Sequence, residues 1–229
     1  MKRACIPAAV LLFFLAVSSG LQAQAVSTAC TVGKDRVTLG FGMAGTAFEG
    51  LFIDTGTVIE DYLYLGVGWN LKFGTLGEAP LQESVIRGVC ALPVLTQDDI
   101  IPVSFILTAI YEKINSSGAY LDTEGLIRTG TGYEAAVDLY RDFAVGSGFT
   151  LRTVLSGVYT AGVLITEPLV GTTGTTTTER YARYLYGIKL GVLYKLEDRL
   201  VLSFAVNGHM DESFGIHYGA VFGIASAGK

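Results

Sequence analysis

Beyond its first 25 residues the chain lacks any long apolar run, although half of its 229 residues are apolar. A helix that crosses a bilayer needs about 20 consecutive apolar residues, so the sequence argues against membrane helices after the N-terminal stretch. Charged residues are scarce too, at 16% against about 25% in an ordinary soluble domain. Together with a mean hydropathy of +0.47, these gaps indicate β-structure that is exposed to lipid.

Histidine is nearly absent, with two residues in the whole chain, which limits both catalysis and metal binding. No phosphate loop, nucleotide fingerprint or zinc-ligand spacing occurs, and we expect neither an enzyme nor a cofactor or metal site. A pI near 5.0 without a basic stripe argues against nucleic acid. His209, Asp211 and Ser213 could form a hydrolase-like set at an external turn, but an ordinary solvated turn is the favoured interpretation.

The N-terminus has the features of a secretory signal peptide over residues 1–25. Lys2 and Arg3 precede a short apolar core, and Ala23-Gln24-Ala25 is a small-x-small cleavage site. Residues 26–229 then form one exported domain. In an oxidising compartment Cys30 and Cys90 are permitted to form a disulfide, and the sequence leaves this open. A lipid-modified Cys30 is disfavoured because it lies far beyond the apolar core.

Strict alternation of side chains is the main structural signal. In 63–73, Leu63, Leu65, Val67, Trp69, Leu71 and Phe73 occupy one face, and glycine, tyrosine, asparagine and lysine occupy the other. Successive side chains of a strand point to opposite faces, so this segment is predicted to be a strand with one apolar face. The segment 200–224 repeats the pattern as a hairpin and is predicted to pair back to the first strand.

The connections predict how the strands are arranged. Two long polar loops are expected at 115–131 and 157–180, and short turns at 96–99, 141–142, 195–199 and 210–213. A further turn is expected at 54–57. Outer-membrane barrels have short periplasmic turns and longer external loops, and the order of these connections fits that alternation. The predicted fold is all-β, a transmembrane up-and-down antiparallel β-barrel, with eight strands favoured and ten possible.

Polar residues at alternate positions are predicted to face the lumen of this barrel. They are Lys72, Glu112, Glu134, Asp138, Arg152, Lys189 and His217. Because buried charges need compensation, the cations and anions are expected to pair across a narrow interior, which leaves either a closed scaffold or a narrow polar path. Side chains nearly fill an eight-stranded barrel, so the sequence argues against a general porin.

With its signal peptide, its outward apolar alternation, its glycine-rich inner faces and segments such as Gly132–Asp142, the chain resembles the small outer-membrane β-barrels of the OmpA/OmpW type. The resemblance implies a bacterial outer-membrane protein in contact with lipid, with exposed surface loops and passage of small or hydrophobic solutes through the lumen. One departure is the tail, because the last aromatic, Phe222, lies seven residues from the end.

Three functional hypotheses follow. The first is an outer-membrane barrel with a narrow channel for small or hydrophobic solutes. The second is a structural or adhesive barrel whose loops bind a host surface ligand without transport. The third is a secreted soluble barrel that binds an apolar ligand, which requires Trp69, Phe204, Tyr218 and Phe222 to face inward.

Overall fold

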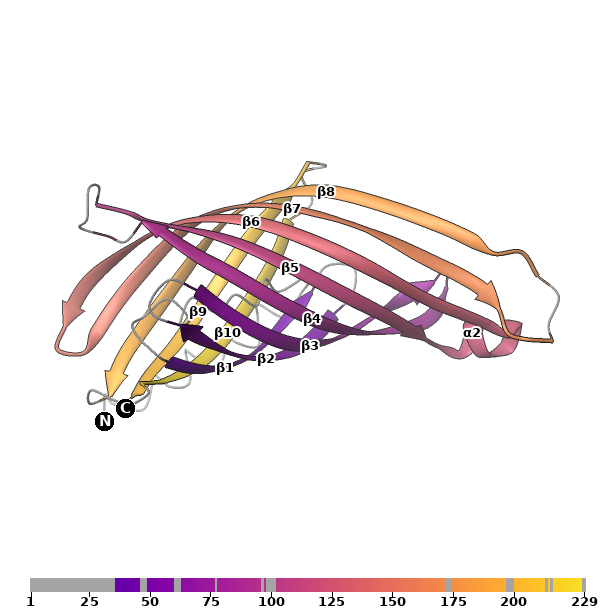
Figure 1. The fold of residues 1–229 in the computed structure, drawn as a ribbon, viewed down its shortest axis with the longest axis horizontal. Coiled ribbons are helices and arrows are strands. Elements are labelled where there is room, and N and C mark those ends of the chain that lie inside the picture. The colour runs from indigo at the N-terminus through magenta and orange to yellow at the C-terminus, as the bar shows by residue number, and fades with distance from the viewer. Residues whose placement is uncertain are drawn as a thin grey trace, which may run out of the picture.

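The computed structural model describes residues 36–45, 49–59, 63–76, 78–95, 97, 102–171, 174–196, 200–212, 214 and 216–227 (Figure 1). For 36–45, 49, 216–218 and 226–227 it describes the backbone only. The predicted signal peptide, Cys30 and Ser213 lie outside the described residues, and so does the side chain of His217.

Ten strands and one short helix make up the described part of the chain. The strands are β1 (Arg36–Gly45), β2 (Glu49–Ile59), β3 (Leu63–Leu76), β4 (Ala79–Leu95), β5 (Ser104–Ser117), β6 (Leu126–Gly146), β7 (Phe149–Pro168), β8 (Thr177–Leu196), β9 (Leu200–Asp211) and β10 (Ile216–Ala227). The helix, α2 (Ala119–Glu124), lies between β5 and β6.

Each strand pairs antiparallel with its sequence neighbours, and β1 pairs with β10 to close the barrel. The predicted up-and-down antiparallel barrel is confirmed. So is the pairing of the last hairpin with the first strand, in which Phe41 lies opposite Phe222. The favoured count of eight strands is wrong, and the alternative of ten is right. The segment 36–53 supplies β1 and the first five residues of β2, which raises the count above eight.

The turn expected at 54–57 is also absent, because these residues lie inside β2 and pair with β3. Asp54 and Gly56, the residues that suggest a turn, have structural positions inside the strand. Asp54 is buried on the inner wall. Gly56 leaves room for the ring of Tyr64, whose hydroxyl oxygen comes within 2.3 Å of where a Cβ would stand. A side chain at position 56 would therefore collide with this ring.

The two long loops predicted at 115–131 and 157–180 are mostly strand. β5 continues to Ser117 and β6 begins at Leu126, so α2 occupies most of the first connection, while the second shortens to 169–176. The turn expected at 141–142 lies within β6, and the chain reverses at 147–148 instead. Threonine favours strands, which explains how polar Thr-rich segments continue the sheet.

The barrel has two unlike ends. We call the end where β1 begins and β10 ends the near end, and the opposite end the far end. The connections 118–125 and 169–176 both lie at the far end, as the predicted alternation requires. β6, β7 and β8 have 21, 20 and 20 residues, whereas β1 and β2 have 10 and 11. Figure 1 shows the resulting asymmetry, with β5 to β8 running out toward α2 well beyond β9 and β10.

No helix in the described part of the chain is long and apolar enough to cross a membrane. α2 ends at Gly125, whose φ of 63° is left-handed and suits glycine. Its one buried side chain, Leu121, faces the sheet, and the helix contacts β4 and β6. The helix therefore covers part of the sheet at the far end.

Candidate functional site

The outer wall of the barrel exposes large apolar side chains on strand after strand. On β3, Val67 is 60% exposed and Trp69 is 42% exposed, whereas Tyr64 and Asn70 are buried. Similar exposed side chains on other strands are Ile86, Leu92, Leu107, Val137, Leu139, Leu155, Ile188, Leu190, Val192 and Leu202. The apolar face of 63–73 thus points outward. An apolar surface of this extent is far larger than on soluble monomers.

Aromatic side chains border this surface toward the far end. Tyr111 on β5 packs against Tyr133 on β6, with 5.6 Å between ring centroids. Tyr159 on β7 packs against Tyr184 on β8 at 4.9 Å. These four residues form the upper aromatic row.

A second aromatic pair borders the surface toward the near end, where Phe149 packs against Tyr194 at 4.4 Å. The stretches 149–159 on β7 and 184–194 on β8 connect the two levels. Both match the 9–11 residues that a tilted strand needs to cross a bilayer core. Aromatic girdles at both interfaces are typical of membrane barrels. We call the outward side chains between the two levels the apolar belt.

Four strands continue past the upper aromatic row. The projecting wall comprises residues 112–117 of β5, 126–132 of β6, 160–168 of β7 and 177–183 of β8. A strand rises about 3.4 Å per residue, so the 21 residues of β6 extend for roughly 70 Å, about twice what a membrane crossing requires. The excess projects at the far end.

Arg87 lies at the centre of a charged cluster inside the barrel, the lumen cluster (Arg87, Glu112, Glu134, Asp138 and Lys189). The Nε atom of Arg87 lies 2.9 Å from Oε1 of Glu112, and its Nη2 lies 3.7 Å from Oε2 of Glu134. The side chain of Arg87 is only 2% exposed. Three neighbouring strands, β4, β5 and β6, thus place one cation between two carboxylates.

The second ion pair of the lumen cluster joins β6 to β8. Nζ of Lys189 lies 2.8 Å from Oδ2 of Asp138, and both side chains are buried. Ser156 on the intervening β7 donates its hydroxyl to the other oxygen, Oδ1, at 2.6 Å. Asp138 therefore has a partner on each oxygen, which compensates the cost of burying its charge.

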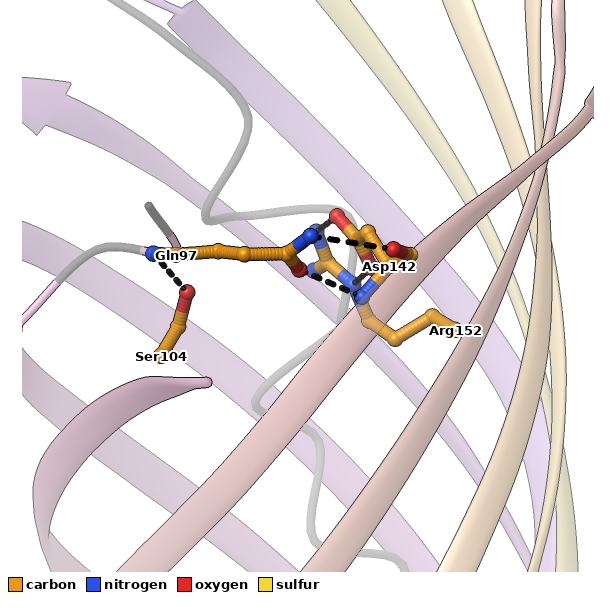
Figure 2. A network of polar contacts seen from close by, with 4 residues as sticks. All are labelled: Gln97, Ser104, Asp142 and Arg152. Carbon is orange, nitrogen blue, oxygen red and sulfur yellow. Dashed lines mark hydrogen bonds and ion pairs between the residues drawn. The ribbon is translucent and has the colours of Figure 1, made fainter. Parts of the chain in front are cut away.

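A separate polar network lies toward the near end (Figure 2). Arg152 on β7 donates from Nε and Nη2 to the two carboxylate oxygens of Asp142, each at 2.7 Å. Gln97 accepts from the backbone N–H of Asp142 at 2.7 Å and donates to its carbonyl at 3.1 Å. The backbone N–H of Gln97 in turn donates to Ser104 at 2.6 Å. Gln97 thus ties the connection between β4 and β5 to the inner wall of β6.

Six of the seven residues predicted to face the lumen are buried on the inner wall: Lys72, Glu112, Glu134, Asp138, Arg152 and Lys189. The structure pairs Asp138 with Lys189 and brings Glu112 and Glu134 together through Arg87, but it places Arg152 apart, with Asp142. Lys72 adds positive charge near Glu112 and Glu134. A functional role for these residues stays a prediction.

Two polar residues on the inner wall, Arg87 and His209, differ from the sequence expectations. Arg87 was not among the predicted lumen residues, although the alternation of 81–91 places it on the inner face with Glu83. His209 was expected at an external turn, yet it lies inside β9, 2% exposed, with its ring over Gly187. Cys90 is a free cysteine. Among the described residues, no group of three or more His, Cys, Asp and Glu side chains is placed to hold a metal.

No protein-family model and no curated protein sequence matches the chain. Among solved structures, the translocator domain of the autotransporter NalP from Neisseria meningitidis is similar at 12% identity, covering 97% of each chain with a TM-score of 0.46. The N-terminal β-barrel domain of OprF from Pseudomonas aeruginosa has 10% identity over 85% of this chain and 98% of its own, with a TM-score of 0.33. A structure named KdgM porin has 9% identity, 85% and 99% coverage, and a TM-score of 0.37. At these TM-scores the likeness assigns neither family nor function.

Proposed function

We propose that the chain is an integral outer-membrane β-barrel of a diderm bacterium, with a closed lumen and a projecting wall that carries its surface function. The observation that carries the proposal is the reversed partition of the barrel. Apolar side chains cover the outside between two aromatic levels, while paired charges lie inside beside a small apolar core that includes Val89, Ile110 and Val154. Outer-membrane barrels have this arrangement, and soluble barrels bury their apolar face instead.

The near end is the periplasmic end in this proposal. The connections at 147–148 and 197–199 are short and lie at the near end, whereas α2 and 169–176 lie at the far end; the connection 96–103 is the longer exception at the near end. External loops are the longer ones in such barrels. The predicted signal peptide supplies the export step. The projecting wall then stands on the cell surface, where a host or matrix ligand has access to it.

The closed lumen favours a scaffold over a channel. Arg87, Arg152 and Lys189 are almost completely buried, and each is ion-paired to a carboxylate on another strand. Side chains that line a water-filled path are exposed to solvent, so the burial of these charges favours an interior filled by side chains, as in narrow barrels. We therefore propose a structural or adhesive surface barrel that does not transport solutes.

Trp69 gives a direct test of the membrane assignment, because it is the only tryptophan in the chain and points outward among exposed apolar side chains such as Val67 and Ile86. After reconstitution into lipid vesicles, we expect its fluorescence to be quenched by a quencher attached to lipid acyl chains and protected from aqueous iodide. The third hypothesis, a soluble barrel with Trp69 inward, predicts protein that stays in the aqueous phase. Iodide quenching as strong as that of free tryptophan would overturn the membrane proposal.

Conductance in planar bilayers tests the closed lumen separately. We expect no steady ion flux through the inserted wild-type barrel. If wild-type flux were measured and changed in Lys72→Ala or Glu112→Ala, the lumen would be a channel lined by these residues, and the scaffold proposal would be wrong. Vesicles in which Trp69 is shown to be lipid-quenched provide the control for insertion.

A further inference from the structure

One edge of the projecting wall has no neighbouring strand in the described part of the chain. β9 ends at Asp211, which lies opposite Leu185 of β8. Beyond that point, residues 177–184 of β8 pair with 159–166 of β7 on one side only. Figure 1 shows this part of β8 as the outer rim of the sheet. Its other side presents backbone N–H and C=O groups to solvent.

Such an edge can be extended by another strand, because its backbone groups are a template for pairing. Natural edges are protected by charges, and this one carries Glu179, Arg180 and Arg183, all exposed. Glu179 is 63% exposed even though Arg128 lies 3.0 Å from it. A carboxylate can accept further hydrogen bonds, so Glu179 has capacity for a second cation.

We propose that this edge pairs antiparallel with the same edge of a second copy of the chain, centred on Tyr181. In that register, Glu179 of each copy lies opposite Arg183 of the other, on the same face as the two Tyr181 rings. Arg180 lies opposite Ala182 on the other face. Opposite charges directly across an antiparallel pair are stabilising, and like charges are destabilising. The charges on this edge therefore match its own antiparallel copy.

The same charges disfavour the parallel arrangement. A parallel pair in register sets Glu179 against Glu179 and Arg183 against Arg183. The antiparallel pair is isologous, like the interfaces of two-fold dimers, and its two-fold axis stands perpendicular to the sheet. This axis turns the second barrel upside down relative to the first.

The inverted orientation identifies where the contact forms, and this step rests on the proposed outer-membrane function. All copies in one membrane have their walls on the same side, so two of them cannot be inverted relative to each other. Copies in two membranes that face each other are inverted in this way. The edge is thus assigned to homotypic contact between opposing surfaces. A single short strand pair is weak, but many pairs between two membranes act together through multivalency.

Vesicle tethering tests the proposal. Two populations of vesicles carrying the full chain are labelled with different dyes, and tethering is measured by light scattering and dye co-localisation. We expect wild-type vesicles to tether and high salt to weaken this, because salt screens exposed charges. Glu179→Arg vesicles alone should not tether, since arginines face each other, and Arg183→Glu vesicles alone should not, since glutamates do.

The mixture of the two variants is the decisive arm. When Glu179→Arg vesicles meet Arg183→Glu vesicles, every charged position regains an opposite partner, and tethering should return. Tethering by either variant alone at the wild-type rate, or no recovery in the mixture, would overturn the register. Matched controls are Glu167→Arg on β7, away from the edge, and Arg180→Glu, which faces alanine. Both should tether like wild type, and loss in Arg180→Glu equal to that in Arg183→Glu contradicts the pairing.

Insertion is followed in the same vesicles by lipid quenching of Trp69. Wild-type barrels that insert but do not tether overturn the pairing and leave the membrane proposal intact. Barrels that do not insert overturn the membrane proposal instead. In that case the pairing is measured by sedimentation of the protein in detergent micelles. The mixture of the two variants should form dimers, and each variant alone should stay monomeric. Monomers in the mixture would overturn it.

Discussion

Strands β6, β7 and β8 run without interruption from the apolar belt into the projecting wall, yet their outer faces change character at the upper aromatic row. Within the belt the outward side chains are apolar, as at Val137 and Leu155, and the inward ones include the ion pair of Asp138 and Lys189. In the wall the inner face combines an apolar cluster, in which Val85 of β4, Ile114 and Leu164 pack with Tyr181, with the ion pair of Arg128 and Glu179.

The outer face of the wall is correspondingly more polar. Its outward side chains include Lys113, Asn115, Thr129, Thr131, Thr178 and Arg180, although Ile127 and Ile165 are exposed apolar exceptions. The backbone pairing is continuous across the change. The difference teaches that the medium outside the sheet decides the character of its outer face. In lipid the outside is apolar, whereas in water a sheet buries its apolar face.

Removing the central cation of the lumen cluster should have the largest effect. Arg87→Ala leaves Glu112 and Glu134 buried without their shared partner. Breaking a buried ion pair from one side costs about 3–5 kcal/mol, and we expect a loss of this size in the free energy of unfolding. Urea unfolding of the reconstituted barrel, followed by Trp69 fluorescence, measures it.

The matched variant in the wall is Arg128→Ala. Its partner Glu179 is largely exposed to solvent, and exposed pairs contribute about 0–1 kcal/mol. The barrel should therefore unfold at nearly the wild-type urea concentration. Equal losses for the two arginines would show that the belt interior is as hydrated as the wall, which contradicts the closed lumen.

The next largest effect is expected from a charged residue on the outer face of β7, because its cost shows whether lipid or water surrounds that position. Leu155 lies outward near the middle of the belt on β7 and is 59% exposed. An arginine at the midplane of a membrane barrel costs about 2–4 kcal/mol, so Leu155→Arg should reduce stability in vesicles by this amount. The same variant should insert more slowly, which protease protection over time measures.

Ile165→Arg is the control, because Ile165 is also outward on β7 but lies in the projecting wall. The cost of a charge falls to about 0–1 kcal/mol near the interface, and beyond it we expect no loss. If Ile165→Arg were as harmful as Leu155→Arg, the upper aromatic row would not mark the edge of the membrane.

The same change of surroundings explains which parts of the fold were predictable. The alternation of 63–73 and 184–194 gave the correct strands and faces, because lipid demands apolar residues at every outward position. The alternation fades in the wall, and 115–131 and 157–180 were wrongly expected to be loops. Their Thr and Gly residues are typical of loops in water, while the pairing that makes them strands comes from distant parts of the chain.

The lumen site was predictable to a similar extent. Glu134, Asp138 and Lys189 stand at inward positions of clean alternating segments and were found. Arg87 was missed because its strand has apolar residues on both faces, with Val85 and Val89 inward and Ile86 outward, so hydropathy does not mark the faces. The partners of each charge depend on the register between strands, which alternation within one strand does not contain.

The smallest of the expected effects concerns two glycines of β7 on either side of the aromatic row. A Cβ at Gly162 in the wall would lie 2.4 Å from the hydroxyl oxygen of Tyr181 and 2.7 Å from the backbone oxygen of Thr131. A Cβ at Gly157 in the belt meets nothing within 4 Å. Overpacking typically costs about 1–3 kcal/mol, so Gly162→Ala should lower the free energy of unfolding by this amount.

Gly157→Ala should leave that free energy unchanged, because the added methyl group enters open space on the lipid side. Replacing Tyr181 by leucine tests whether the collision with Tyr181 causes the loss of stability in Gly162→Ala. Combined with Gly162→Ala, the smaller Tyr181→Leu side chain should cost less than the sum of the two single changes, since it makes room for the methyl group. Additive losses would mean that Tyr181 does not rest on Gly162.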